Sequence, residues 1–230
     1  MQKGIKFRIY PNREQKNFIH QTLGCCRLIY NRGLAMRKES YEEGKKIGYT
    51  QTSAMLTELK RQEEFAFLKA ADSIALQQSL RDLDRSFVNF FQKRASYPTF
   101  KSKHNRFQSY RTVNQKDNIR IVGRYIKLPK LGFVKIRQSM EVGKINHVTI
   151  EYTPAGKYFA VLNVDFEPEP RPNAGGTIGI DVGIKAFYSD SNGNTVSNPR
   201  YLERAMRKLI REQRRLSRKQ KDSHNRGKQR

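Results

Sequence analysis

The sequence predicts an α+β fold in which a helical unit is inserted into a small β-barrel or curled sheet. Residues 1–10 alternate apolar and charged side chains with the period of two that is typical of a strand. Three helical apolar patterns follow, and strand-like segments return from residue 118 onward. Because an isolated strand could not satisfy its backbone hydrogen bonds, we expect the opening strand to pair with the later ones.

The helical unit begins after the first strand. Asn12 and Gln15 have the spacing of a capping box, which predicts the start of the first helix. A second helix is predicted to begin near residues 50–53, and a third covers 76–90 with the most regular apolar stripe of the chain. These elements give a helical unit of three helices.

Strand patterns dominate residues 118–166, where Pro154-Ala155-Gly156 marks the turn of a hairpin. After a Pro-rich linker, a strand is expected over 177–182, a second hairpin turns at Asn192-Gly193, and Asn198 and Pro199 are expected to open a helix. The expected domains are therefore 1–10 with 112–168 for the barrel, 11–111 for the helical unit, 169–174 for the linker and 175–230 for a smaller second domain.

Charge limits the classes of partner. The 230 residues contain 46 Lys and Arg against 21 Asp and Glu, a formal net charge of +25. Such an excess destabilises a folded chain by self-repulsion unless a polyanion neutralises it, which favours nucleic acid as the partner. No apolar run approaches the roughly 20 residues of a membrane span. We expect a cytoplasmic, nucleoid-associated prokaryotic protein, and we expect the adjacent Cys25 and Cys26 to form a reduced, buried pair.

Two basic segments are candidate nucleic-acid contacts. Between residues 97 and 111, aromatic side chains alternate with cations, which combines stacking surfaces with phosphate-binding groups. The final predicted helix carries many cations against two glutamates. A solvated loop and a solvated helix face are the alternatives. The candidate backbone contacts are Lys101, Lys103, Arg106, Tyr110, Arg111, Arg204, Arg207, Lys208, Arg211, Arg214 and Arg215.

Motifs throughout the chain resemble those of the transposon-encoded TnpB (OrfB) proteins, RNA-guided DNA nucleases related to the type V CRISPR effectors. GIDVGIKAF alone is moderately specific, whereas the set together is highly specific. The matching segments are FRIYPN at 7–12, LGCCRLIYN at 23–31, YTQTS at 49–53, ALQQSLRDLDRSFVNFF at 75–91, SYRT at 109–112, KLPKLGFVKI at 127–136 and GIDVGIKAF at 179–187.

The resemblance implies a wedge-like, OB-like β-barrel, an inserted helical recognition lobe with a helix-turn-helix, and a RuvC nuclease domain of RNase H fold. In that family the aspartate that matches Asp181 is the first acidic residue of the RuvC site and a Mg²⁺ ligand. Two hard cations held by carboxylates would activate water and stabilise the leaving oxygen of a phosphodiester.

The later acidic residues of such a site have no clear counterpart in the sequence given. Asp190, Glu203, Glu212 and Asp222 are the carboxylates after Asp181, and none has the apolar strand context of a metal ligand. The two CxxC pairs of the family's zinc ribbon are absent, so no zinc site is expected. We therefore expect an incomplete RuvC-like domain, a truncated chain, and no DNA cleavage by these residues alone.

The resemblance also implies that the first part of the chain reads a short motif in double-stranded DNA beside the target and holds a guide RNA from the transposon end. Glutamine can bond adenine with two hydrogen bonds, and hydroxyl groups can reach base edges or phosphates. The alternative is that these residues only cap and flank helices. By position, the candidate motif-binding residues are Tyr49, Thr52, Ser53, Ser73 and Gln77.

Three functions remain open from the sequence. The first is the N-terminal part of a Mg²⁺-dependent, RNA-guided endonuclease of a mobile element, which binds DNA and guide RNA. The second is a nuclease-dead, RNA-guided repressor, and the third is a general basic RNA-binding protein. Guide-dependent binding to a motif-bearing duplex separates the first two from the third. The sequence does not indicate an oligomeric state.

Overall fold

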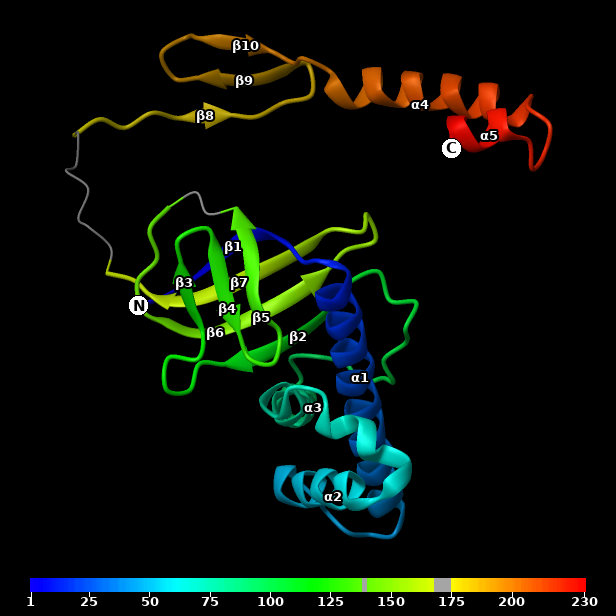
Figure 1. Cartoon of the computed structure of the whole chain (residues 1–230). Coiled ribbons are helices and arrows are strands. Elements are labelled where there is room, and N and C mark those ends of the chain that lie inside the picture. Colours follow the sequence, from blue (N-terminus) through cyan, green and yellow to red (C-terminus); the bar gives the residue numbers. More distant parts are fainter. Residues whose placement is uncertain (138–139, 168–174) are drawn as a thin grey trace. The chain divides into compact units, whose positions relative to one another are not determined.

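A computed structural model describes residues 1–137, 140–167 and 175–230, and it divides the chain into two compact units, Met1–Pro168 and Glu169–Arg230. Figure 1 shows the helices and strands of both. The predicted linker at 169–174 lies outside the described residues.

The first unit contains a seven-stranded antiparallel sheet in the order β2-β6-β7-β1-β5-β4-β3. The opening strand β1 pairs with β7 on one side and β5 on the other, which confirms the expected pairing with later strands. Within the described residues this order ends at β2 and β3 without closing, and the sheet is curled (Figure 1). The strands are β1 (Gln2–Tyr10), β2 (Gln108–Val113), β3 (Arg120–Val122), β4 (Tyr125–Leu128), β5 (Gly132–Arg137), β6 (Ile145–Tyr152) and β7 (Tyr158–Asp165).

Strands β6 and β7 form the predicted hairpin. The amide of Gly156 donates to the carbonyl of Thr153, and Gly156 adopts a φ of +68°, where glycine is favoured. Along β7, alternate side chains from Tyr158 to Val164 are buried while their neighbours face outward. The hairpin thereby supplies one layer of the core that packs under the helices.

Three α-helices and one 3-10 helix connect β1 to β2. The first, α1 (Arg13–Glu42), begins with the predicted capping box, in which the Asn12 side chain accepts from the amide of Gln15 and the Gln15 side chain accepts from the amide of Asn12. The side-chain nitrogen of Gln15, Nε2, also donates to the carbonyls of Leu131 and Phe133. These bonds fix the start of α1 against the end of the sheet that contains β5.

The remaining helices pack across α1. They are α2 (Tyr49–Arg61), the 3-10 helix η1 (Glu63–Lys69) and α3 (Ser73–Phe91), which begins with Asp72 as its N-cap. Gly33 of α1 allows α3 to approach closely, since a Cβ there would lie 3.0 Å from methyl groups of Leu80 and Leu83. Cys25 and Cys26 are buried free thiols on α1, as predicted.

The second unit contains a small three-stranded sheet and two helices. They are β8 (Ile180–Asp181), β9 (Ala186–Asp190), β10 (Thr195–Ser197), α4 (Tyr201–Ser217) and α5 (His224–Gln229). The predicted hairpin is present, with Gly193 at a φ of +83°. The strand expected over 177–182 is shorter than predicted, because only Ile180 and Asp181 pair with β9.

The predicted start of α4 is wrong by two residues. Asn198 does not cap the helix, because its side-chain oxygen accepts from the amide of Arg200 while its nitrogen donates to the carbonyl of Ile184. Arg200 then adopts a left-handed conformation, with a φ of +50°, and the helix begins at Tyr201. Asn198 thus connects α4 to the loop before β9.

Among the helices of the described residues, none combines the length and apolar character that a membrane crossing requires.

Candidate nucleic-acid interface

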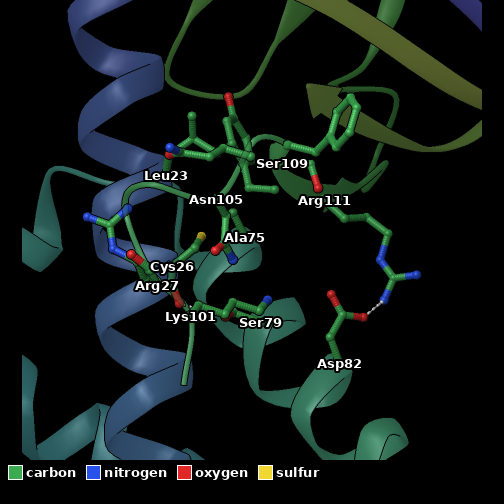
Figure 2. A pocket seen from close by; sticks show the side chains of 14 residues that line it. Leu23, Cys26, Arg27, Ala75, Ser79, Asp82, Lys101, Asn105, Ser109 and Arg111 are labelled. Carbon is green, nitrogen blue, oxygen red and sulfur yellow. Dashed lines mark hydrogen bonds and ion pairs between the residues drawn. The ribbon is translucent and has the colours of Figure 1, made fainter. Parts of the chain in front are cut away.

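A pocket lies where α1, α3 and the segment before β2 meet, and we call it the junction pocket (Figure 2). Its volume is about 270 Å³. It is lined by Leu23, Cys26, Arg27, Ala75, Ser79, Asp82, Lys101, Ser102, Asn105, Phe107, Gln108, Ser109, Tyr110 and Arg111. The lining therefore contains three cations, several hydroxyl and amide groups, and one carboxylate.

The charges of the junction pocket are unevenly compensated. The guanidinium of Arg111 pairs with the carboxylate of Asp82, as Figure 2 shows. The ammonium group of Lys101 lies 4.0 Å from the centre of the Tyr30 ring, and desolvation there lowers its pKa. The side chain of Asn31 holds the Lys101 backbone through two hydrogen bonds. With Arg27 also on the lining, the pocket has net positive charge and suits an anionic group such as phosphate.

The structure brings together only part of the predicted basic segment. Lys101 and Arg111 line the junction pocket, whereas Lys103 and Arg106 lie exposed outside its lining. Tyr110 also lines the pocket, but the residue is only 7% exposed, and its contact with a nucleic acid stays a prediction. Residues 108–113 form β2, which begins four residues before the expected boundary at residue 112, and Tyr110 and Thr112 face the core.

Sequence reasoning missed Arg27. This residue lies on α1, distant in sequence from the 101–111 segment, and only the fold brings the two together in the junction pocket. The exposed ring of Phe107 lines the same pocket and supplies a surface for stacking. A helical cation next to an aromatic loop is a pattern that a linear scan of the sequence does not reveal.

A second candidate surface is formed by one side of α2 and one side of α3, and we call it the two-helix face. Along α3, Ser73, Gln77 and Arg81 are four residues apart and exposed, so they lie on one side of the helix. Lys60, near the end of α2, donates to the hydroxyl of Ser73 at 3.1 Å. The guanidinium of Arg81 lies 4.8 Å from the ring centre of Tyr49, at the start of α2.

The end of α2 at Lys60 therefore lies beside Ser73, and the start of α2 at Tyr49 lies beside Arg81, so α2 runs alongside the exposed side of α3. Tyr49 and Ser53 are half-buried on the first turns of α2. The candidate Thr52 does not belong to this face, because its side chain is buried and its hydroxyl bonds to the carbonyls of Gly48 and Tyr49. Its assignment to motif binding is therefore wrong, while Arg81 is an addition that sequence reasoning missed.

The second unit carries the remaining predicted cations on α4. Arg207, Arg211, Arg214 and Arg215 line one shallow hollow together with Arg218, which was not predicted. Glu203 and Glu212 pair with some of them at 3.1–4.0 Å, where the arginines and Glu203 are exposed and Glu212 is half-buried. Exposed pairs of this kind contribute little to stability, so the arginines remain available to a polyanion. Arg204 and Lys208 are exposed on the same helix.

Asp181 is exposed on β8 and pairs through its backbone with Ser189. The carboxylate of Asp190 accepts three hydrogen bonds within its own turn, from the amides of Asn192 and Asn194 and from the Asn194 side chain, and these bonds lower its pKa. Within 1–137, 140–167 and 175–230, no group of three His, Cys, Asp or Glu residues is placed to hold a metal ion. The described donor set therefore does not fit a two-metal site.

Comparison with known proteins extends to the whole chain. A family model described as "Helix-turn-helix domain", of the OrfB group, matches residues 1–46, and one described as "Probable transposase" matches residues 147–230. A protein of Streptomyces pristinaespiralis named "Putative RNA-guided DNA endonuclease" is 36% identical over 234 residues, covering 100% of this chain and 58% of its own length.

The chain belongs to the TnpB/OrfB family. A second TnpB/OrfB relative, "Putative RNA-guided DNA endonuclease InsQ" of Escherichia coli K12, is 34% identical and covers 97% of this chain and 56% of its own length. The chain thus spans a little over half the length of these curated relatives. A structure titled "Cryo-EM structure of CRISPR-Cas12f Ternary Complex" aligns with 95% of this chain and 55% of its own, at 12% identity and a TM-score of 0.40, a likeness too weak to support an argument.

Proposed function

We propose that this chain is the nucleic-acid-recognition part of an RNA-guided DNA endonuclease of a mobile element. The observation that carries the proposal is the 36% identity to a relative with that printed name, which extends over the entire chain. The net charge of +25 and the two candidate surfaces of the first unit support it. In this proposal the curled sheet corresponds to the family's wedge, α1 to α3 to its recognition lobe, and the second unit to the start of its RuvC domain.

The two surfaces of the first unit have different roles in the proposal. The junction pocket, with Arg27, Lys101 and Arg111, holds phosphates of guide RNA or DNA and sets overall affinity. The two-helix face reads the flanking motif of a DNA duplex, with Gln77 as its exposed amide and Tyr49 beside Arg81. Base contacts discriminate between sequences, whereas phosphate contacts do not.

The first test identifies RNA and DNA partners together. The chain is expressed with the DNA that surrounds its gene, the RNA that copurifies is sequenced, and the complex is offered a pool of duplexes with a randomised segment. One enriched RNA from the element and one short enriched DNA motif are expected. Binding to unrelated RNAs with no DNA motif would contradict the proposal and support a general basic RNA-binding protein.

Variants then assign the motif reading. Gln77→Ala is expected to relax one position of the enriched motif by about 5-fold to 150-fold, the range of about 1–3 kcal/mol for a bidentate base contact. Tyr49→Ala is expected to weaken motif preference through the loss of its contact with Arg81. The control is Gln21→Ala, because Gln21 is an exposed glutamine on α1, outside the two-helix face. This change should leave the motif unchanged. If Gln77→Ala and Tyr49→Ala keep the wild-type motif, the two-helix face does not read bases.

We also propose that these 230 residues do not cleave DNA by themselves. Asp181 is the carboxylate that would contribute to the family's Mg²⁺ site, but the described residues contain no group of three His, Cys, Asp or Glu placed to hold a metal ion, and Asp190 on the neighbouring strand is bonded within its own turn. The purified complex is incubated with Mg²⁺ and a target duplex, in parallel with Asp181→Asn. No cleavage above that of Asp181→Asn is expected. Cleavage that the substitution abolishes would show that the site is complete, and would contradict this part of the proposal.

A further inference from the structure

A second hollow of the first unit lies between the C-terminal ends of α1 and α3, and we call it the aromatic groove. Its volume is about 600 Å³, within the roughly 300–1,000 Å³ range of small-molecule sites. Its lining contains three cations, five aromatic rings and no carboxylate. The proposed function uses none of these residues. The residues are Arg37, Tyr41, Lys45, Lys46, Ile47, Phe87, Phe90, Phe91 and Tyr97.

Four of the five rings that line the groove, those of Phe87, Phe90, Phe91 and Tyr97, form a connected cluster anchored in the core. Phe87 is buried against the α1 and α3 interior, and its ring centre lies 5.6 Å from that of Tyr97. Phe90 contacts Tyr97 at 5.2 Å and Phe91 at 5.4 Å. Yet Phe91 is 73% exposed and Tyr41 is 72% exposed. The buried part of the cluster thus holds large exposed ring surface in place beside a hollow, which is the arrangement of a stacking platform.

Polar groups of the groove favour an anionic, hydrogen-bonding occupant. Arg37 is largely buried, with its guanidinium over the Phe87 ring at 4.7 Å and paired with Asp84. Its Nε–H is buried and has no hydrogen-bond partner in the part of the chain that the structure describes. Lys45 and Lys46 are exposed on the lining, and Glu43, outside it, pairs with Lys45 at 3.1 Å.

We propose that the aromatic groove binds an unpaired nucleobase of a single-stranded nucleic acid, with the base stacked on the exposed ring of Phe91 and the flanking phosphates at Lys45 and Lys46. An unpaired base presents a free face to a ring, whereas the faces of bases in a duplex are covered by their neighbours. The inference rests on the proposed binding of nucleic acid and adds a separate site for a single strand.

The test separates stacking from charge. The full chain is titrated into fluorescent single-stranded RNA and DNA oligonucleotides, each in an intact form and in a form whose internal nucleotides are abasic. The wild type is expected to prefer the intact form of at least one strand type by about 5-fold or more, since stacking on an aromatic side chain contributes about 1–3 kcal/mol per base. The strand type with the preference identifies RNA or DNA as the source of the base.

Variants assign the preference to the groove. Phe91→Leu keeps an apolar side chain but removes the ring, so it is expected to lose most of the preference for intact bases while binding abasic probes as the wild type does. Phe133→Leu, the same change at an exposed ring on β5, is the control and should keep the preference. Lys46→Gln is expected to flatten the slope of log affinity against log salt by about 0.7, the value for one phosphate of a single strand. Thermal unfolding checks that each variant is folded.

The outcomes distinguish this inference from the proposed function. If the wild type binds the intact probes and Phe91→Leu retains the full preference, the inference is wrong and the proposed function stands. If the wild type binds intact and abasic probes equally, or Phe91→Leu weakens both equally, the groove does not hold a base and the inference is likewise overturned. If the wild type binds no probe and no nucleic acid in the copurification experiment, the inference and the proposed function both fail.

As a second measurement, a 5-iodouracil probe should crosslink to the peptide that contains Phe91 or Tyr41. Crosslinks confined to other peptides would contradict the inference.

Discussion

The two units of this chain contain similar sequence patterns but bury them differently. In the first unit, the apolar stripe of α3 packs against α1 and the sheet, and Leu76, Leu80 and Leu83 are buried. In the second unit, α4 also has an apolar stripe, yet none of its residues is buried. An amphipathic pattern therefore predicts which side of a helix is apolar, but it does not predict that another element covers that side.

The units also differ in how their charges are used. In the first unit, Arg37 and Arg111 pair with Asp84 and Asp82 of α3, so part of the positive charge stabilises the fold. The arginines of α4 face mostly solvent, and of their glutamate partners Glu203 is exposed and Glu212 half-buried. The first unit thus combines a packed core with selected cationic sites, whereas α4 of the second unit presents a row of exposed arginines around one hollow.

The largest expected effect compares one leucine from each unit. Leu80→Ala, at a side chain that is 1% exposed, should lower the free energy of unfolding of the first unit by about 2–5 kcal/mol through lost burial and a cavity. Leu209→Ala, at a side chain that is 56% exposed, should change stability by less than about 0.5 kcal/mol. Urea denaturation followed by circular dichroism measures both variants. Equal losses would show that α4 packs against another part of the protein in solution, which would remove the difference between the units.

A smaller effect is expected at the helix caps. Asn12→Ala removes the acceptor for the amide of Gln15 and should destabilise the first unit by about 1 kcal/mol. Ser223→Ala removes the corresponding acceptor for the amide of Arg226 at the start of α5. Because α5 is short and exposed, this control should leave the main unfolding transition in place. A shift of that transition by Ser223→Ala as large as that by Asn12→Ala would mean that the second unit unfolds together with the first.

The smallest effect concerns pH in the second hairpin. The hydrogen bonds from Asn194 and Asn192 lower the pKa of Asp190 below its ordinary value of 3.8. Because the folded hairpin favours the carboxylate, this stabilisation is fully present above the ordinary pKa and is lost as the pH falls through the lowered folded value. The NMR signals of β9 and β10 should therefore weaken as the pH falls below 3.8. Asp190→Asn should remove this pH dependence. An identical acid profile in Asp190→Asn would assign the change to other groups.

The local signals of the sequence were sufficient for several elements. The capping box at Asn12, the hairpins at Gly156 and Gly193, and the pairing of β1 with later strands were predicted correctly because short-range backbone chemistry or one unavoidable pairing determines each of them. Asn198 was predicted to cap α4, but its side chain bonds to Ile184 instead. A capping residue with a competing partner elsewhere in the fold cannot be recognised from spacing alone.

The candidate site was predictable only in part for the same reason. Lys101 and Gln77 were found because their residue types and sequence context suggested contact with nucleic acid, and both lie on accessible surfaces. Tyr110 and Thr52 have equally suitable side chains but face the core. Arg27 and Arg81 were missed because their roles depend on neighbours from other elements, the 101–111 segment and Tyr49.

By itself, the sequence determined the family, the order of helices and strands, and the strongly cationic character of this protein. These properties follow from residue types and from interactions within a few positions of the chain. Only the tertiary structure decided which cations meet at the junction pocket, which apolar stripes are buried, and that Phe91 and Tyr41 stay exposed beside the aromatic groove. Burial and site geometry depend on contacts between residues distant in sequence, and the periodicity of a segment carries no information about which distant segment will cover it.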